Sequence, residues 1–226
     1  MTLMPDSPPL PLSDEPVRRP WDARLALRLI RPLKSSWVTP NHLTTVRLVV
    51  GLAAALAFTP GSYGWSNLAA LALVLSNFLD HTDGELARLS GKTSRFGHLY
   101  DLASDAVVTV LLFVGIGIGV GARSGVEFEL PAVLLGAVAG AAVSVIFFLR
   151  MRIEETLGKT ATRQAWLGGF ETEDVLYLMP LATLSNALAP LLVAAAIGAP
   201  LFAVWVAVDY RRVMRRDRPM SPGVAG

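Results

Sequence analysis

The stretch "DHTDGELARLSGKTSRFGHLYDLASD", residues 80–105, joins two apolar segments that each have the composition of a membrane helix. It holds four aspartates in two pairs, spaced three and four residues apart: Asp80, Asp83, Asp101 and Asp105. Side chains at these spacings share one face of a helix. The short loop between the pairs is long enough to bring the two helix ends side by side. The stretch therefore predicts a helical hairpin on which four carboxylates converge.

The composition excludes an ordinary soluble domain. Of 226 residues 53% are hydrophobic and only 17% are charged, and the mean hydropathy is +0.49. Cysteine is absent, which excludes disulfides and thiolate zinc sites. The net charge is a small +2, and we expect no nucleic-acid partner.

Several apolar segments approach the ~20 residues that a membrane-spanning helix needs. The fold class we predict is all-α, an integral membrane bundle of six transmembrane helices within residues 36–212. The last two segments form one long apolar run, which must turn near Asn186 to Pro190 because a single helix of that length would overshoot the bilayer. The expected helices cover residues 43–60, 65–86, 97–121, 130–150, 174–188 and 190–209.

The termini are expected to lie outside this bundle. Residues 1–20 are rich in proline and acidic residues without an apolar signal-peptide core, which predicts a disordered tail. Residues 21–35 place apolar and basic side chains on opposite sides of a helical wheel, as in a short amphipathic helix on the membrane surface. A soluble helix packed on a neighbour is the alternative. Residues 213–226 are expected to form a basic cytoplasmic tail.

Basic residues indicate the orientation. With six spans, the Lys and Arg clusters before the first helix, after the second, after the fourth and after the sixth all fall on one side, and only Arg123 falls on the other. By the positive-inside rule both termini are then cytoplasmic. We expect an integral protein of the bacterial inner membrane with its active site facing the cytoplasm.

Four converging carboxylates would repel one another and lose solvation in a membrane protein unless cations joined them. All-oxygen ligation suits Mg²⁺, with Mn²⁺ as a substitute. Two such ions bridged by shared carboxylates are a common device for phosphoryl transfer. The alternative is that the acids are solvated charges at helix ends.

The full spacing is more specific than the acids alone. Asp80-x2-Asp83-Gly84-x2-Ala87-Arg88-x8-Gly97-x3-Asp101-x3-Asp105 resembles the signature of the CDP-alcohol phosphotransferase family. The segment "TPNHLTTVR", residues 39–47, is similar to the lead-in that precedes the first helix of that family. The resemblance covers about residues 35 to 212.

The resemblance implies a role for each matching position. Asp80, Asp83, Asp101 and Asp105 would bind two metal ions, and Asp105 would also deprotonate the acceptor hydroxyl. Gly84 would let the cytidine nucleotide approach the backbone, since any Cβ would block that contact. Arg88 and Ser94 would hold donor phosphate oxygens, and Asn41 to Thr44 would line the nucleotide pocket. Otherwise, Arg88 is a membrane-topology anchor and Ser94 a loop cap.

The reaction implied by the resemblance is transfer of a substituted phosphoryl group to an alcohol with release of CMP. CDP-diacylglycerol is the expected donor and a soluble CDP-alcohol the alternative. The acceptor could be inositol phosphate or glycerol phosphate, whose phosphate group would need nearby cations. The alternative is that the basic residues near the site only set the membrane topology. The candidates are Arg150, Arg152, Lys159, Arg163 and Arg211.

Two further features leave alternatives open. "GIGIGVG" at residues 115–121 and Gly136-x3-Gly140 could form homodimer contacts or close helix packing within one chain. A membrane prenyltransferase and a cation transporter are rival functions. The first usually has two acidic clusters far apart in sequence, and the second places its acids near the bilayer midplane. Neither rival explains Gly84 and Arg88 at their fixed offsets.

Overall fold

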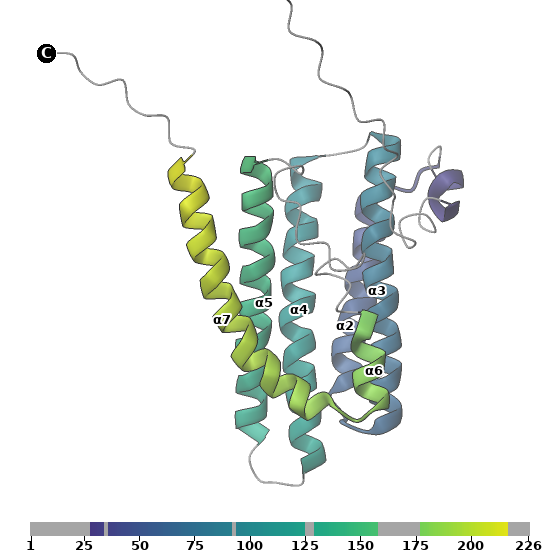
Figure 1. Ribbon diagram of the computed structural model, residues 1–226. Helices are drawn as coiled ribbons and strands as arrows, with labels where there is room; N and C mark the ends of the chain where they lie inside the picture. The colour runs from purple at the N-terminus through teal and green to yellow at the C-terminus, as the bar shows by residue number, and fades with distance from the viewer. Residues whose placement is uncertain (1–27, 34–35, 92–93, 125–128, 158–176, 217–226) are drawn as a thin grey trace, which may run out of the picture.

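The long apolar segments form long helices in the computed structural model. The structure describes residues 28–33, 36–91, 94–124, 129–157 and 177–216, and this part of the chain contains helices and their connections but no strand (Figure 1). The all-α fold class is therefore confirmed for these residues. The elements are η1 (Arg31–Leu33), α2 (Pro40–Phe58), α3 (Tyr63–Ser90), α4 (Arg95–Ser124), α5 (Glu129–Leu157), α6 (Met179–Leu184) and α7 (Leu188–Arg216).

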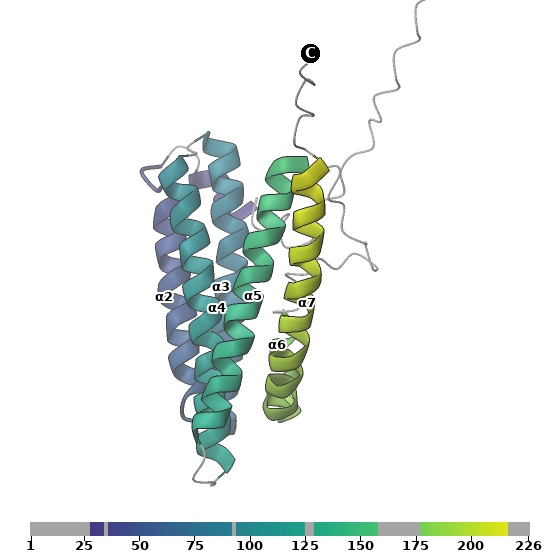
Figure 2. The same cartoon turned by 90° about the vertical axis from the view of Figure 1, so that its left-hand side faces the viewer.

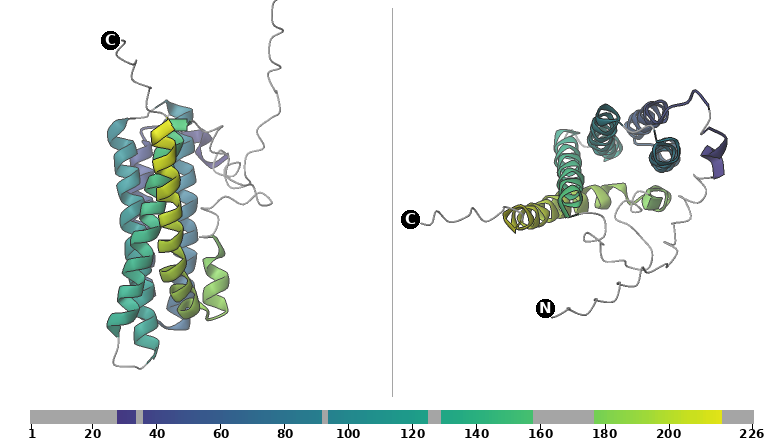
Figure 3. Two further views of the ribbon diagram at one scale, coloured as in Figure 1. Left: turned by 60° about the vertical axis from the view of Figure 1, so that its left-hand side comes forward. Right: turned by 90° about the horizontal axis from the view of Figure 1, so that it is seen from above.

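The helices lie side by side in an order set by their contacts. α2 packs on both α3 and α4, α5 packs on α4, and α7 packs on α5. Seen from above, α2, α3 and α4 gather on one side, while α5 and α7 extend away from them (Figure 3). The side view shows α7 leaning along α5 on the side away from α2 (Figure 2). The short helix α6 contacts α3.

Close backbone contacts hold the centre of the bundle together. A Cβ on Gly115 would lie 2.2 Å from the carbonyl oxygen of Ala55 in α2, and one on Gly136 would lie 2.2 Å from that of Phe113 in α4. Only glycine lets the backbones approach this closely. Gly115 and Gly136 therefore serve packing within the chain, the second of the two expected alternatives.

Four helices in the described part of the chain are long and apolar enough to cross a membrane: Pro40–Phe58, Arg95–Arg123, Pro131–Ile153 and Leu188–Arg215. α3 has 28 residues, but its second half carries the acidic and basic side chains of the quoted stretch. This helix runs past the expected end at residue 86 and stops at Gly91, whose φ of 66° is left-handed.

The expected helix over residues 174–188 differs most from the structure. Its described portion contains α6, a helix of 6 residues, followed by a turn. The turn passes through Asn186 in a left-handed conformation, with φ 55°, before α7 begins at Leu188. The predicted turn near Asn186 is confirmed. Residues 1–27 and 217–226, with most of the amphipathic segment 21–35, lie outside the described residues.

Basic residues mark one end of the bundle. This end is formed by the end of α3, the start of α4 and the ends of α5 and α7, which lie together at the top of Figure 1. Arg88 is in the last turn of α3, and Arg95 is the first residue of α4. Arg123 is in the last turn of α4, at the opposite end.

Candidate active site

Three of the four aspartates meet at the basic end of the bundle. Asp80 comes from α3, and Asp101 and Asp105 come from consecutive turns of α4. One carboxylate oxygen from each lies within 4.8 Å of the other two. The predicted convergence of the α3–α4 hairpin is thus found for these three residues, which we call the acidic cluster. All-oxygen donor sets of this kind fit Mg²⁺ or Mn²⁺.

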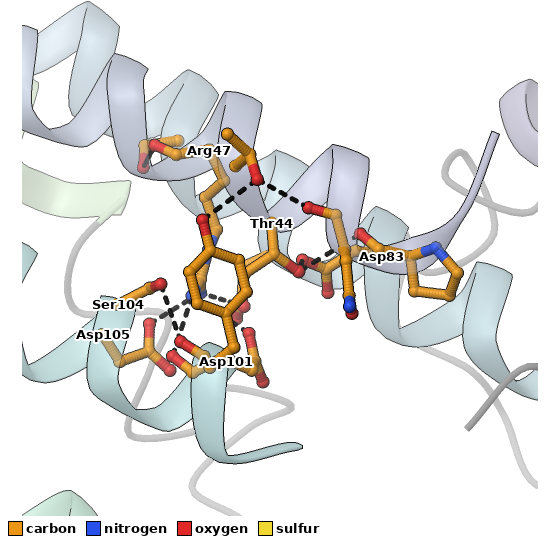
Figure 4. A network of polar contacts seen from close by, with 12 residues as sticks. Thr44, Arg47, Asp83, Asp101, Ser104 and Asp105 are labelled. Carbon is orange, nitrogen blue, oxygen red and sulfur yellow. Dashed lines mark hydrogen bonds and ion pairs between the residues drawn. The ribbon is translucent and has the colours of Figure 1, made fainter. Parts of the chain in front are cut away.

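Asp83 does not join the acidic cluster in this structure. Its side chain is buried, and its Oδ2 accepts a hydrogen bond of 2.7 Å from Thr44 Oγ1 in α2 (Figure 4). The Thr44 hydroxyl also lies 3.2 Å from the Pro40 carbonyl one turn earlier. Thr44 therefore positions Asp83, and its expected place in a nucleotide pocket stays a prediction, as does the metal-ligand role of Asp83.

A buried arginine that the sequence analysis did not single out lies within the acidic cluster. Arg47 of α2 is only 3% exposed and forms ion pairs with all three carboxylates. Its Nη1 contacts Asp80 Oδ1 and lies 2.6 Å from Asp105 Oδ1. Its Nη2 lies 3.0 Å from Asp101 Oδ1 and 3.2 Å from the Asp101 carbonyl oxygen (Figure 4).

A signal for Arg47 was present in the sequence. It is the one charged residue within the expected helix 43–60, and ionisable residues inside membrane helices usually have a functional partner. Which partner it has depends on how α2 packs on the α3–α4 hairpin, and the one-dimensional spacing does not contain that information.

Hydrogen bonds fix α2 against its two neighbours around this arginine. Ser76 Oγ of α3 donates to the Arg47 carbonyl oxygen at 3.1 Å. Thr45 Oγ1 lies 3.0 Å from the Tyr100 hydroxyl of α4. The Ser76 bond is buried and limits how far the backbone that carries Arg47 can shift along the bundle, whereas the Thr45–Tyr100 bond is exposed and water can replace it.

The expected donor-binding residues surround the cluster in different ways. Apart from the backbone of its own helix and its chain neighbours, a Cβ placed on Gly84 would meet only the Arg88 Nη2, at 3.6 Å, among the described residues, so the space above Gly84 is open. Arg88 is exposed and pairs with Glu85 at 2.9 Å. Ser94 Oγ accepts a hydrogen bond of 2.9 Å from Gly97 N, the loop-cap alternative. Their substrate contacts stay predictions.

Asn41 explains the glycine at position 97. A Cβ on Gly97 would lie 2.9 Å from Asn41 Oδ1 and 3.1 Å from Ser94 Oγ. A side chain at position 97 would therefore have to displace the ends of these two side chains. This contact places Asn41 beside the first turn of α4, one turn before Asp101.

The expected acceptor-binding residues are spread over α5 and α7. The Arg150 guanidinium lies 5.3 Å from the centre of the Phe202 ring, and Arg211 is exposed on α7. Arg152 pairs with Glu155 at 2.9 Å, and Glu155 lies 3.4 Å from His98 Nε2. Lys159 and Arg163 lie outside the described residues. Acceptor binding stays a prediction for all of these positions.

Comparison with known proteins identifies the family of this chain. Residues 37–208 match the family model CDP-alcohol phosphatidyltransferase, which covers the acidic cluster, Arg47 and the helices α2 to α7 almost completely. The chain belongs to this family.

Curated relatives in the CDP-alcohol phosphatidyltransferase family match shorter stretches. The archaetidylinositol phosphate synthase of Pyrococcus horikoshii is 35% identical over 92 residues, 41% of this chain and 47% of that protein. Cholinephosphotransferase 1 of Danio rerio is 38% identical over 97 residues, 38% of this chain and 25% of that protein. The matched stretches thus span less than half the length of these relatives.

Solved structures share the fold. The phosphatidylinositol phosphate synthase of Mycobacterium tuberculosis in complex with manganese and citrate superposes with a TM-score of 0.57 at 21% identity, covering 91% of this chain and 92% of that one. The same enzyme with CDP-DAG bound gives 0.54 at 20% identity, covering 90% and 98%. At these identities the similarity shows a common fold.

Proposed function

We propose that this protein transfers a phosphatidyl group from CDP-diacylglycerol to an alcohol, with release of CMP, in phospholipid biosynthesis. The observation that carries the proposal is the acidic cluster at the basic end of the bundle, with oxygens of Asp80, Asp101 and Asp105 within 4.8 Å. Membership of the CDP-alcohol phosphatidyltransferase family supplies the reaction class.

Two divalent cations, Mg²⁺ or Mn²⁺, are the proposed cofactors. Asp80, Asp101 and Asp105 would hold them together with Asp83, whose carboxylate is one helical turn from Asp80. When bound, such ions neutralise charge on phosphate oxygens and on a leaving nucleotide. Manganese in a structure of similar fold is consistent with this choice of metal.

The proposed chemistry assigns one step to each side chain. Asp105 accepts the proton of the acceptor hydroxyl, whose oxygen then attacks the phosphorus that carries the donor's lipid alcohol. The phosphoanhydride bond breaks, and CMP leaves with the electron pair of that bond. Gly84 leaves open space for the cytidine nucleotide, Arg88 and Ser94 bind phosphate oxygens, and Asn41 and Thr44 line the nucleotide pocket. This chemistry depends on positioning and charge stabilisation, so no covalent nucleophile is required.

The proposed acceptor is a phosphorylated polyol, with inositol phosphate and glycerol phosphate as its two representatives. Relatives named archaetidylinositol phosphate synthase and CDP-diacylglycerol–glycerol-3-phosphate 3-phosphatidyltransferase favour this class. Arg150, Lys159, Arg163 and Arg211 are the proposed cations for the acceptor phosphate, since guanidinium and ammonium groups suit phosphate oxygens. Relatives named cholinephosphotransferase favour the second candidate, the same chemistry with a soluble CDP-alcohol donor.

A release assay tests the activity and separates the two donors. Purified protein in detergent with Mg²⁺ receives CDP-diacylglycerol with inositol phosphate, glycerol phosphate or serine, or CDP-choline with diacylglycerol, and CMP is measured. We expect CMP with CDP-diacylglycerol and a phosphorylated polyol. If CMP is released only with CDP-choline, the donor is a soluble CDP-alcohol. If no CMP is released in any arm, the proposed enzymatic activity is refuted.

We further propose six membrane crossings with both termini and the active site on the cytoplasmic side of a bacterial inner membrane. The basic residues at the site end support this orientation. Because the chain has no cysteine, single cysteines give a clean test with a membrane-impermeable maleimide. Arg215→Cys at the site end should react in inside-out vesicles and Ser62→Cys at the far end in intact spheroplasts; the reverse pattern would overturn the orientation.

A homodimer is also proposed, and cross-linking in native membranes tests it.

A further inference from the structure

Arg47 lies at the centre of the acidic cluster and has more acidic partners than a residue with only a packing role needs. A buried arginine in a membrane helix needs one acidic partner to offset its desolvation. Arg47 has three, drawn from two other helices, and the same Nη1 atom contacts both Asp80 Oδ1 and Asp105 Oδ1. Asp80 and Asp105 are also two of the three residues whose carboxylates each offer an oxygen within 4.8 Å of the others and could hold an ion.

The three nitrogen atoms of the guanidinium also differ in their contacts. Nη1 and Nη2 face the carboxylates, whereas Nε is buried without a hydrogen-bond partner among the described residues. An unpaired buried donor is costly. The side chain is therefore held through Nη1 and Nη2 alone, and moving Nη1 away from Asp80 and Asp105 would leave the two Nη2 bonds to Asp101 in place.

The charges do not balance. One guanidinium offsets one negative charge among the three carboxyl groups, so with these groups ionised the acidic cluster is net negative and attracts a divalent cation. An arginine and a divalent cation compete for a position between the same two carboxylates, because they repel each other and both need the carboxylate lone pairs.

We propose that Arg47 is an internal counter-cation that holds the acidic cluster together without metal and is displaced from Asp80 and Asp105 when a divalent cation binds. The inference rests on the metal site of the proposed function and deepens it. Arg47 has two opposite effects under this proposal. It stabilises the metal-free protein, and it lowers the affinity of the site for metal.

The experiment compares Arg47→Gln with Arg47→Lys and with Arg123→Gln. Glutamine removes the charge and keeps a polar side chain, lysine keeps the charge, and Arg123 is an exposed arginine at the far end of α4, where it donates to Asn186 at 3.0 Å. Thermal unfolding of the full-length protein in detergent is followed in EDTA and in rising MnCl₂. Bound Mn²⁺ is measured independently by the loss of its free electron-spin resonance signal.

Arg47→Gln should unfold at a lower temperature than wild type in EDTA and should bind Mn²⁺ about tenfold more tightly or better, because its competitor is gone. Its unfolding temperature should therefore rise more steeply with Mn²⁺. Arg47→Lys should keep near-wild-type Mn²⁺ affinity, and Arg123→Gln should change neither quantity.

Weaker or unchanged Mn²⁺ affinity in Arg47→Gln would overturn the proposal, because a purely structural arginine predicts an equal loss of stability with and without metal. If Arg47→Gln can be purified only in Mn²⁺, the proposal is supported, and if it does not fold even in Mn²⁺, the proposal is wrong. Failure of wild type to bind Mn²⁺ would instead refute the metal site itself.

Discussion

Replacing Thr44 by valine removes one hydroxyl group while keeping the size and branching of the side chain. Thr44 Oγ1 donates a 2.7 Å hydrogen bond to Asp83 Oδ2, and the exposed fractions are 3% for Thr44 and 5% for Asp83. A buried carboxyl oxygen that loses its donor costs about 1–3 kcal/mol. For a chain of this size each kcal/mol lowers the unfolding temperature by about 2–4 °C.

The loss of the Thr44 hydroxyl should also lower the catalytic activity, because Asp83 is one helical turn from Asp80 and loses the hydrogen bond that holds it in place. We expect kcat/KM for CMP release to fall by about tenfold, which corresponds to about 1.4 kcal/mol and lies within the same range. The assays are thermal unfolding in detergent with EDTA and CMP release with saturating Mg²⁺.

Thr45→Val is the matched control. Thr45 is exposed on the same helix, and its hydroxyl bonds to the Asn41 carbonyl at 2.8 Å and to Tyr100 at 3.0 Å. Water can replace both partners, so a change of less than about 0.5 kcal/mol is expected. Thr44→Ser keeps the hydroxyl and should restore most of the activity. If Thr44→Val and Thr45→Val behave alike in both assays, the positioning role of Thr44 is refuted.

Three further substitutions, the last with a control variant, test separate parts of the site and the bundle. Asp105→Asn should abolish CMP release while leaving the unfolding temperature within a few degrees of wild type, and near-normal activity would remove Asp105 from its role as base. Gly84→Ala should fold normally, since its Cβ meets a single side-chain atom at 3.6 Å, yet lose CDP-donor affinity in a binding titration; unchanged affinity would mean that no ligand approaches there. Gly119→Ala should cost about 1–3 kcal/mol of stability, because its Cβ would lie 2.1 Å from a backbone carbonyl oxygen of α2. Gly64→Ala, with open space around its Cβ, should leave stability unchanged or slightly higher, and equal losses at both positions would contradict the packing argument.

Much of the fold could be predicted from the sequence, because the length of an apolar segment indicates a membrane helix. The starts of α2, α3, α4, α5 and α7 were each expected to within three residues, and so were the ends of α2 and α4. The ends of α3, α5 and α7 lie four to seven residues beyond the expected ones, because each helix continues past its apolar segment; α3 stops only where Gly91 adopts a left-handed backbone. Apolar length indicates bilayer thickness, whereas a helix end depends on its capping residue.

The site was predictable to the extent that it depends on periodicity. Spacing within one helix indicates which side chains share a face, and this was enough to place Asp101 and Asp105 together opposite Asp80. It does not indicate which neighbouring helix that face meets. For this reason the sequence did not show that α2 supplies both Arg47 to the acidic cluster and Thr44 to Asp83.

The arrangement of α2, α3 and α4 also has a consequence for biosynthesis of the protein. Thr44, Arg47 and all four aspartates lie between residues 44 and 105, and α2 packs on both of the other helices that carry them, α3 and α4. A chain emerging from the ribosome N-terminus first could assemble this polar centre before α5 and α7 enter the bilayer. Arg47 would then shield the carboxylates during insertion, when a nascent hairpin carrying four bare acids would be difficult to accommodate in lipid.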